Sequence, residues 1–431
     1  MKKFISLVLV VLLAVSTLAG CGSSNTSGNN SSGASSADST VASAPAESTA
    51  APAEKAKLTI WFYWENKDQQ SILAGLCDQY NKSQDAAEIS SQYIPFADFK
   101  KQLSIGMAAG KVPDLTLIDN PDLPSYASMG LFADVTDKIK AIPGYDQYFD
   151  GPVKSCTLDG KVYGLPFGSN DIALYYNLDM FSKAGIAQAP TTWDELRADA
   201  KKLSGNGVYG LGVSGVNTEE GTFQFMPWLL SAGATPFKVD GPEGIKAFTF
   251  VSDLVKDGSM PKDVMNWVQS DVNKQFEAGN LAMMINGPWQ LPSLAKDTPD
   301  LKFGVALIPK DQQYASVLGG EDWGVVNGKN VDAAIDFLKF VVSPDLLKDY
   351  CNKFGYFPSR KDMASDPVFT SDPIKKVFVD EMQYASPRGP SAQWPQLSLA
   401  ISTALQEVIT GSKTPEAAAK DAQAKIDGIG K

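Results

Sequence analysis

The sequence predicts an α/β protein in which helices cover both faces of a parallel β-sheet. Between residues 58 and 118, short apolar runs alternate with amphipathic segments, as expected for strands that alternate with helices. The same alternation returns between residues 282 and 342. The chain has 431 residues, which is enough for two or three domains that each bury a core.

The first twenty residues form a targeting segment rather than part of the fold. Two lysines precede the apolar run Phe4–Ala19, which is the pattern of a signal peptide. The run ends in small residues before Cys21, as in the lipobox of bacterial lipoproteins. We therefore expect a signal peptide over 1–20, lipidation of Cys21, and a protein anchored to the cell membrane outside the cytoplasm. An uncleaved transmembrane anchor is the alternative, and it needs about twenty apolar residues.

Residues 21–56 comprise the lipidated cysteine and a linker. The linker consists almost entirely of Ser, Ala, Gly, Asn, Thr and Pro, with hardly any large apolar residue. Such a composition cannot bury enough surface to offset the entropy of ordering the chain. We therefore expect a flexible tether between the lipid and the folded part.

The first half of the folded part predicts three strands and two helices in alternation. The run Leu58–Trp64 is short and rich in aromatic and β-branched residues, so we expect a buried strand. Further strands are expected over 89–94 and 115–118. Apolar residues recur at helical spacing over 68–80, and 96–109 also reads as a helix. Three strands that alternate with two helices are expected to form a parallel sheet.

The second half predicts strands over 282–286 and 303–309 and a helix over 331–342. Its helix ends are marked by local chemistry. Thr192 and Glu195 have the spacing of a capping box, and a helix with apolar residues from Leu397 to Val408 can end at Gly411. The pairs Ser343-Pro344 and Thr414-Pro415 each place a hydroxyl N-cap before a proline.

Composition and charge exclude several classes of protein. The chain has 38 basic and 49 acidic residues, a formal net charge of −11, and no cluster of basic residues, which argues against a nucleic-acid-binding surface. It contains no histidine, so Ser-His-Asp and Cys-His catalysis and imidazole metal sites are excluded. We expect no metal site and no cofactor.

Three cysteines remain beyond Cys21, namely Cys77, Cys156 and Cys351. Their number is odd and their spacing is not that of a metal site or a redox pair. We expect them to be small buried hydrophobic residues, and one disulfide between two of them stays an alternative.

Four segments carry a resemblance to a known family: Gly160–Ile186, Thr191–Leu196, Phe276–Trp289 and Gly411–Asp427. Together they resemble the extracellular solute-binding proteins of carbohydrate ABC transporters, family 1, which includes maltose-binding protein. The resemblance implies a two-lobed periplasmic-binding-protein type II fold with a hinge between the lobes. It also implies a mono- or oligosaccharide ligand in the cleft, delivery to ABC transporter permease subunits, and a monomer without catalytic residues.

Placing the hinge crossings by these motifs divides the folded part into two lobes. We expect an N-lobe of 57–165 plus 318–343 and a C-lobe of 166–317 plus 344–431.

A sugar presents C–H faces to aromatic rings and hydroxyl groups to carboxylates, amides and guanidinium groups. Both kinds of residue occur at the ends of expected strands, where open α/β sheets bind ligands. The resemblance adds tryptophans at positions of C-lobe aromatic contacts. The resulting ligand-binding candidates are Trp64, Glu65, Asn66, Asp119, Asn170, Asp171, Trp228, Trp289, Glu321, Asp322, Arg388 and Trp394.

Several candidates have a structural alternative. Trp64 and Trp228 can equally be core residues, as we expect for Trp61 and Trp193. Arg388 lies in a Pro/Gly-rich loop, where its donors can fork onto a ligand or form an ion pair. Maltose-binding protein differs at the position of Asn170, where it has an acidic residue, so maltodextrin is not assumed as the ligand.

Two other classes compete with a binding protein. A secreted glycoside hydrolase needs two carboxylates, which Glu65, Asp119, Glu321 and Asp322 could supply. The chain, however, shows no eightfold strand–helix repeat of a barrel. An adhesive surface lipoprotein would not need tryptophans at loop ends. We therefore predict a protein that binds its ligand and does not convert it.

The lipobox gives a direct prediction. The Cys21→Ala variant should lose its lipid and move from the membrane fraction to the soluble fraction of the producing cells, because the acylated thiol is the expected anchor. Fractionation followed by immunoblotting measures this. If the variant stays with membranes as the unaltered chain does, the lipoprotein assignment is wrong.

Overall fold

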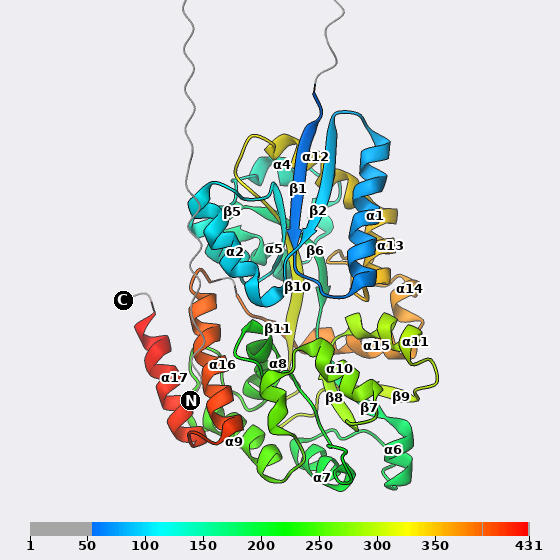
Figure 1. Cartoon of the computed structure of the whole chain (residues 1–431), viewed down its shortest axis with the longest axis vertical. Coiled ribbons are helices and arrows are strands. Elements are labelled where there is room, and N and C mark those ends of the chain that lie inside the picture. Colours follow the sequence, from blue (N-terminus) through cyan, green and yellow to red (C-terminus); the bar gives the residue numbers. More distant parts are fainter. Residues whose placement is uncertain (1–53, 390, 430–431) are drawn as a thin grey trace, which may run out of the picture. The chain divides into compact units, whose positions relative to one another are not determined.

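The computed structural model describes residues 54–389 and 391–429, and most strands lie in two sheets (Figure 1). The signal peptide, Cys21 and nearly all of the linker fall outside these residues. In the larger sheet, the spatial order is β2, β1, β3, β10 and β11. β6 also pairs with β10, on the side opposite to β3. Its strands are β1 (Ala56–Phe62), β2 (Ala87–Tyr93), β3 (Leu115–Asp119), β6 (Gly164–Asn170), β10 (Ser316–Val325) and β11 (Ala385–Pro387).

The predicted parallel strands form one half of this sheet. β1 pairs in parallel with β2 on one side and with β3 on the other. Helices α1 (Lys67–Ser83) and α2 (Phe96–Ala109) provide the crossover connections that parallel neighbours require. The other half contains β10, which runs antiparallel to both β3 and β6.

The smaller sheet is antiparallel, which corrects the expectation that the second half repeats the parallel arrangement. β7 lies in the middle and pairs antiparallel with β8 and β9. β8 and β9 therefore run in the same direction, with β7 between them. Helix α11 (Leu291–Asp297) connects β8 to β9. The strands are β7 (Ala173–Asn177), β8 (Met283–Asn286) and β9 (Phe303–Ala306), and a separate hairpin contains β4 (Thr157–Leu158) and β5 (Lys161–Val162).

Helices bury apolar faces against the larger sheet in a first hydrophobic core. Trp323 on β10 is fully buried there between rings of neighbouring elements. Besides α1 and α2, the helices of this core are α3 (Leu123–Ser128), α4 (Thr136–Lys140), α5 (Asp150–Ser155), α12 (Val331–Val341) and α13 (Pro344–Phe354).

A second core fills the space between one face of the smaller sheet and a helical layer. Leu174 on β7 points into this core, whereas the adjacent Tyr175 packs on the opposite face. The helices of the second core are α6 (Leu178–Lys183), α7 (Trp193–Leu203), α8 (Glu219–Ser231), α9 (Pro242–Lys256), α16 (Trp394–Thr410) and α17 (Pro415–Gly428).

The opposite face of the smaller sheet carries α10 (Gln269–Glu277), α11, α14 (Pro367–Thr370) and α15 (Pro373–Glu381). Short 3-10 turns occur at η1 (Tyr145–Gln147), η2 (Lys262–Asn266), η3 (Pro288–Gln290) and η4 (Met382–Tyr384).

The chain passes between the two sheets more than once. β6 leads almost directly into β7, and β9 returns to β10 after residue 306. Helix α13 packs against α1 and α12, whereas α15 packs against β7 and β9. The lobe boundaries stay a prediction. Because α13 packs against α1 and α12, we favour extending the second N-lobe segment from residue 343 to beyond residue 354.

Most predicted element ends are confirmed. The capping box of Thr192 and Glu195 is present, Thr414 caps α17, and Gly411 ends α16 in the left-handed conformation with φ of 77°. Ser343 was expected as an N-cap, but its hydroxyl donates instead to the carbonyl of Phe340, at 2.8 Å. β1 ends at Phe62, two residues earlier than expected.

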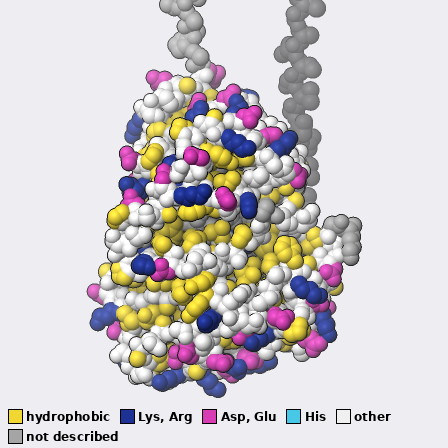
Figure 2. Space-filling model, turned by 180° about the vertical axis from the view of Figure 1, so that it is seen from behind, with side chains coloured by type: hydrophobic (Ala, Val, Ile, Leu, Met, Phe, Trp, Pro, Cys, Tyr) yellow, Lys and Arg dark blue, Asp and Glu magenta, His cyan; other side chains and the backbone are white. Residues whose placement is uncertain are grey.

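The three cysteines of the described residues are buried and free, as expected, so they form no disulfide. Within 54–389 and 391–429, no helix combines the length and apolar character needed to cross a membrane. On the face that Figure 2 shows, basic and acidic side chains are interspersed rather than gathered by sign.

Candidate ligand-binding site

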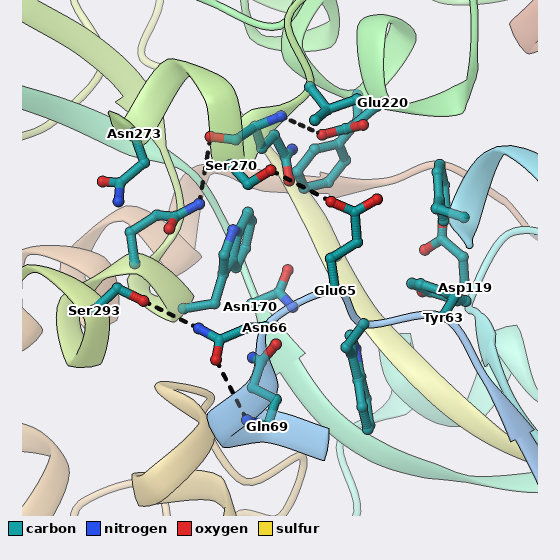
Figure 3. Close-up of a pocket in the computed structure, with 18 of the residues that line it drawn as sticks. Tyr63, Glu65, Asn66, Gln69, Asp119, Asn170, Glu220, Ser270, Asn273 and Ser293 are labelled. Carbon is teal, nitrogen blue, oxygen red and sulfur yellow. Dashed lines mark hydrogen bonds between the residues drawn. The ribbon is translucent and has the colours of Figure 1, made fainter. Parts of the chain in front are cut away.

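A cavity of about 690 Å³ lies where the ends of larger-sheet strands meet helices α8, α10 and α11. Its walls come from segments far apart in the chain (Figure 3). One wall contains Tyr63–Gln69 after β1, the ends of β3 and β6, and the middle of β10. The opposite wall contains the first turn of α8, most of α10 and the region of Trp289. The cavity therefore lies between strands of the larger sheet and helices that pack on the smaller sheet or belong to the second core.

The structure brings eight of the twelve predicted residues into the cavity lining. They come from three strand ends, from the middle of β10, from η3 and from the loop that precedes α16. The eight are Trp64, Glu65, Asn66, Asp119, Asn170, Trp289, Glu321 and Arg388.

The other four predicted residues, Asp171, Trp228, Asp322 and Trp394, lie outside the lining. Trp228 is a core residue of α8, with its ring 6.0 Å from that of Trp193. Asp322 follows Glu321 on β10 but is only 1% exposed, and burial raises its pKa well above the usual value.

Asp171 is completely buried at the connection from β6 to β7, and neither of its carboxylate oxygens has a partner. Burial raises its pKa well above the usual value. Trp394 is 0% exposed, and its Nε1 donates to Glu219 at 2.9 and 3.0 Å. It supports the wall of the cavity from behind.

Glu321 organises three aromatic side chains of the cavity wall. Its Oε1 accepts hydrogen bonds from Tyr63 Oη and Trp64 Nε1, both at 2.9 Å, and from Tyr356 Oη at 3.1 Å. Its Oε2 is buried without a partner. Burial raises the pKa of Glu321 to about 7, although the hydrogen bond from Trp64 opposes this. One carboxylate thus fixes rings from two distant segments.

Arg388 crosses the base of the cavity as a buried cation. Its Nη1 and Nη2 donate to the two carboxylate oxygens of Asp119 at 2.7 and 2.6 Å. Nη1 also donates to Glu219 Oε1 at 2.8 Å, and Nη2 donates to Asn120 Oδ1 at 3.1 Å. The guanidinium lies 4.5 Å from the ring centre of Phe223. The ion-pair alternative for Arg388 is therefore observed, in a buried rather than a surface position.

Polar contacts also join the two walls at the rim (Figure 3). Asn66 accepts from the amide of Asp68 at 2.8 Å, which caps α1, and donates to Ser293 Oγ at 3.0 Å. Asp68 pairs with Lys296 at 2.7 Å. Both Ser293 and Lys296 belong to α11, so residues of α1 and α11 are in direct contact here.

Trp289 is the half-buried aromatic residue of the second wall. Its ring meets that of Tyr356 edge-on at 6.4 Å and lies 6.3 Å from that of Phe223. Apolar ring surface therefore alternates with carboxylate and amide groups around the cavity. This combination can hold a ligand that has both C–H faces and hydroxyl groups.

Sequence reasoning missed several cavity residues. Tyr63 falls within the first strand that the sequence predicts. The observed strand β1 ends one residue before it, so Tyr63 lies in the loop that lines the cavity. Glu219 and Glu220 follow Thr218, so they look like ordinary acidic residues of a first helical turn. Phe223 lies one turn further along α8, and Tyr356 follows the C-cap Gly355. No sequence signal distinguishes these residues from structural ones.

The two sheets, the crossings and the shared cavity define a two-lobed binding protein of the periplasmic type. The chain belongs to the family of bacterial extracellular solute-binding proteins, which it matches over residues 75–377. This confirms the resemblance found in the sequence.

Two solved structures share this fold closely. An ABC transporter solute-binding protein from Thermotoga lettingae bound with α-D-tagatose is 30% identical with a TM-score of 0.82, covering 87% of this chain and 100% of that one. Maltose-bound MalE3 of T. maritima is 25% identical with a TM-score of 0.81 and the same coverage.

The curated relatives bind different solutes. The maltotriose-binding protein of Pyrococcus abyssi is 26% identical over 372 residues, 81% of this chain and 78% of the relative. The lactose-binding protein of Rhizobium radiobacter is 28% identical over 323 residues, 69% and 73% respectively. The sn-glycerol-3-phosphate-binding periplasmic protein of Yersinia pseudotuberculosis is 24% identical over 389 residues, 80% and 85%.

The buried carboxyl groups predict how stability depends on pH. Burial raises the pKa of Glu321 and Glu220 to about 7 and that of Glu381 to about 8. In the unfolded chain a glutamate titrates at about 4.3, so between about pH 5 and pH 8 the folded protein holds more protons than the unfolded chain. Stability should therefore fall as the pH rises, and the melting temperature should be lower at pH 8 than at pH 5.5.

Thermal melts of the protein and of two variants test this. Glu381→Gln cannot ionise and should flatten the decline, whereas Glu243→Gln, at an exposed position on α9, should leave it unchanged. A melting temperature that rises from pH 5.5 to pH 8 would contradict the prediction.

Proposed function

We propose that this protein captures a sugar or short oligosaccharide in the cavity and delivers it to the membrane permease of an ABC transporter. The observation that carries the proposal is the cavity wall, in which Trp289, Tyr356 and Phe223 supply ring surface beside carboxylate and amide groups. A volume of about 690 Å³ lies in the range of small-molecule sites. The sugars in the names of two relatives support the same class of ligand.

We further propose that the protein works as a monomer outside the cytoplasm, anchored through a lipid on Cys21. The signal peptide and lipobox of the sequence support the anchor. The family, which consists of extracellular solute-binding proteins, supports the location.

We propose that the ligand closes the two lobes. Larger-sheet strands line one wall of the cavity, and helices α8, α10 and α11 line the other, so a ligand that fills it contacts both walls. A ligand with more contacts in the closed form shifts the equilibrium toward that form by the difference in affinity. The closed form is then the one that the permease would recognise.

We also propose that the ligand leaves unchanged. A glycoside hydrolase needs two carboxyl groups free to act on one bond. Both oxygens of Asp119 accept from Arg388, Glu321 Oε1 already accepts three hydrogen bonds, and Asp322 lies outside the cavity lining. Of the four acids considered, this leaves Glu65 and Glu321, and Glu321 serves to hold three aromatic side chains in place. The family, which consists of solute-binding proteins, supports binding without conversion.

A thermal-shift screen against mono- and oligosaccharides tests the proposal, because a ligand at 100 times its dissociation constant adds about 2.7 kcal/mol to stability. Chromatography of the ligand after incubation should return it intact. Absence of stabilisation by every sugar, or the appearance of cleavage products, would overturn the proposal.

Two tryptophans give a matched pair of variants. Trp289→Ala removes a ring from the cavity wall and should weaken sugar binding about 30-fold or more, with little change in melting temperature. Trp394→Ala empties a buried position and should cost about 3 to 5 kcal/mol of unfolding free energy, because it leaves a void and removes the donor to Glu219.

Calorimetric titration and melting curves measure both effects. If Trp289→Ala bound sugar normally but melted far below the unaltered protein, Trp289 would be a core residue and the proposed ligand contact would be wrong.

A further inference from the structure

We infer that the cavity selects uncharged sugars or sugars that carry an amino group, and that it rejects anionic ones such as uronic acids and sugar phosphates. This inference rests on the proposed function and adds the charge of the ligand to it. The names of the relatives leave this open, because they include neutral sugars and a phosphate ester.

Acidic side chains outnumber basic ones two to one in the cavity lining. The acidic residues are Glu65, Asp68, Asp119, Glu219, Glu220, Glu277, Asp297 and Glu321, and the basic residues are Lys67, Lys274, Lys296 and Arg388.

The basic groups of the lining are not placed to receive an anion. Arg388 is the buried one, and two carboxylates, those of Asp119 and Glu219, already compensate its charge. Only its Nε is left without a partner. Lys67, Lys274 and Lys296 are exposed, and the last two pair with Asp271 and Asp68. A ligand carboxylate or phosphate would therefore meet no buried, uncompensated cation among the residues that line the cavity.

Among the lining residues, in contrast, the negative charge at Glu321 is left without a compensating cation. Glu321 is 5% exposed and its Oε2 has no partner. No salt bridge neutralises Glu321 in the described part of the chain; its partners are the neutral groups of Tyr63, Trp64 and Tyr356. Above its raised pKa of about 7, the ionised carboxylate of Glu321 therefore repels a ligand carboxylate and attracts an ammonium group.

Two more carboxyl groups add to the negative field, that of Glu65 on the same wall as Glu321 and that of Glu220 on the opposite wall (Figure 3). Glu65 accepts from Ser270 at 3.5 Å, and Glu220 accepts from the amide of Gln269 at 2.6 Å. Both partners are uncharged. The carboxylate of Glu65 raises the pKa of Glu220, after the larger effect of burial, so the two groups are close enough to repel each other. An ammonium group would relieve this repulsion, and an anion would increase it.

Calorimetric titration at pH 8, above the raised pKa of Glu321 and Glu220, against related sugars of different charge tests the inference. The probes are glucose, galactose and mannose, each with its 2-amino, uronic acid and 6-phosphate derivative. Maltose and lactose are compared with maltobionate and lactobionate. Neutral members that bind should bind at least about 30-fold more tightly than their anionic counterparts, because a like-charge contact in a desolvated site costs several kcal/mol. Amino derivatives should bind as tightly as the neutral ones or more tightly.

The Glu321→Gln variant, which keeps the shape of the side chain but removes its charge, should reduce the discrimination against anions at least about fivefold. Glu220→Gln is the second variant and should act in the same direction if Glu321→Gln does not fold. Glu243→Gln on α9 lies outside the cavity lining and should leave the ratio unchanged.

The outcomes separate this inference from the proposed function. If an anionic derivative bound as tightly as its neutral parent, or if both variants kept the full discrimination, the charge inference would be wrong while sugar binding stood. If no member of the panel bound, the proposed function would fail and this inference with it.

Discussion

The burial of Arg388 constrains the rest of the site. A guanidinium group that is 4% exposed is stable only if carboxylates and hydrogen-bond acceptors surround it. Asp119 comes from the end of β3, Glu219 from the first turn of α8, and Arg388 from the loop after β11. These three segments therefore have to meet at one point. That point is the base of the cavity, where larger-sheet strands and the helices of the second core come together.

A second buried carboxylate extends this arrangement to the aromatic wall. Glu321 holds Tyr63, Trp64 and Tyr356 through one oxygen, while Trp394 holds Glu219 in place from the opposite side. The aromatic side chains of this wall are thus positioned by the carboxylate of Glu321, which also lines the cavity that a sugar would enter. Breaking the hydrogen bonds of Arg388 or of Glu321 would leave a buried group without a partner, so both networks are costly to disturb. The same buried carboxylates therefore fix the shape of the cavity and give it negative charge.

The sequence predicted the parts of the structure that depend on local patterns. The alternation over 58–118 gave β1, β2, β3 and the helices between them, and Thr192, Thr414 and Gly411 marked helix ends correctly. It did not predict β6, β7 or the antiparallel smaller sheet, because their pairing depends on contacts between distant segments. Eight of twelve site residues line the cavity, and five of them, Trp64, Glu65, Asn66, Asp119 and Asn170, lie at or just after strand ends. Residues such as Trp394, Glu219 and Tyr356 were misplaced or missed, because their burial depends on tertiary packing.

The central claim is that one ligand contacts both lobes and holds them together. Small-angle X-ray scattering of the protein, without ligand and with a saturating concentration of a sugar that the screen identifies, tests it most directly. We expect a smaller radius of gyration in the presence of the sugar, because closure brings the two sheets and their helices nearer. A radius of gyration that is unchanged at saturation would contradict the claim.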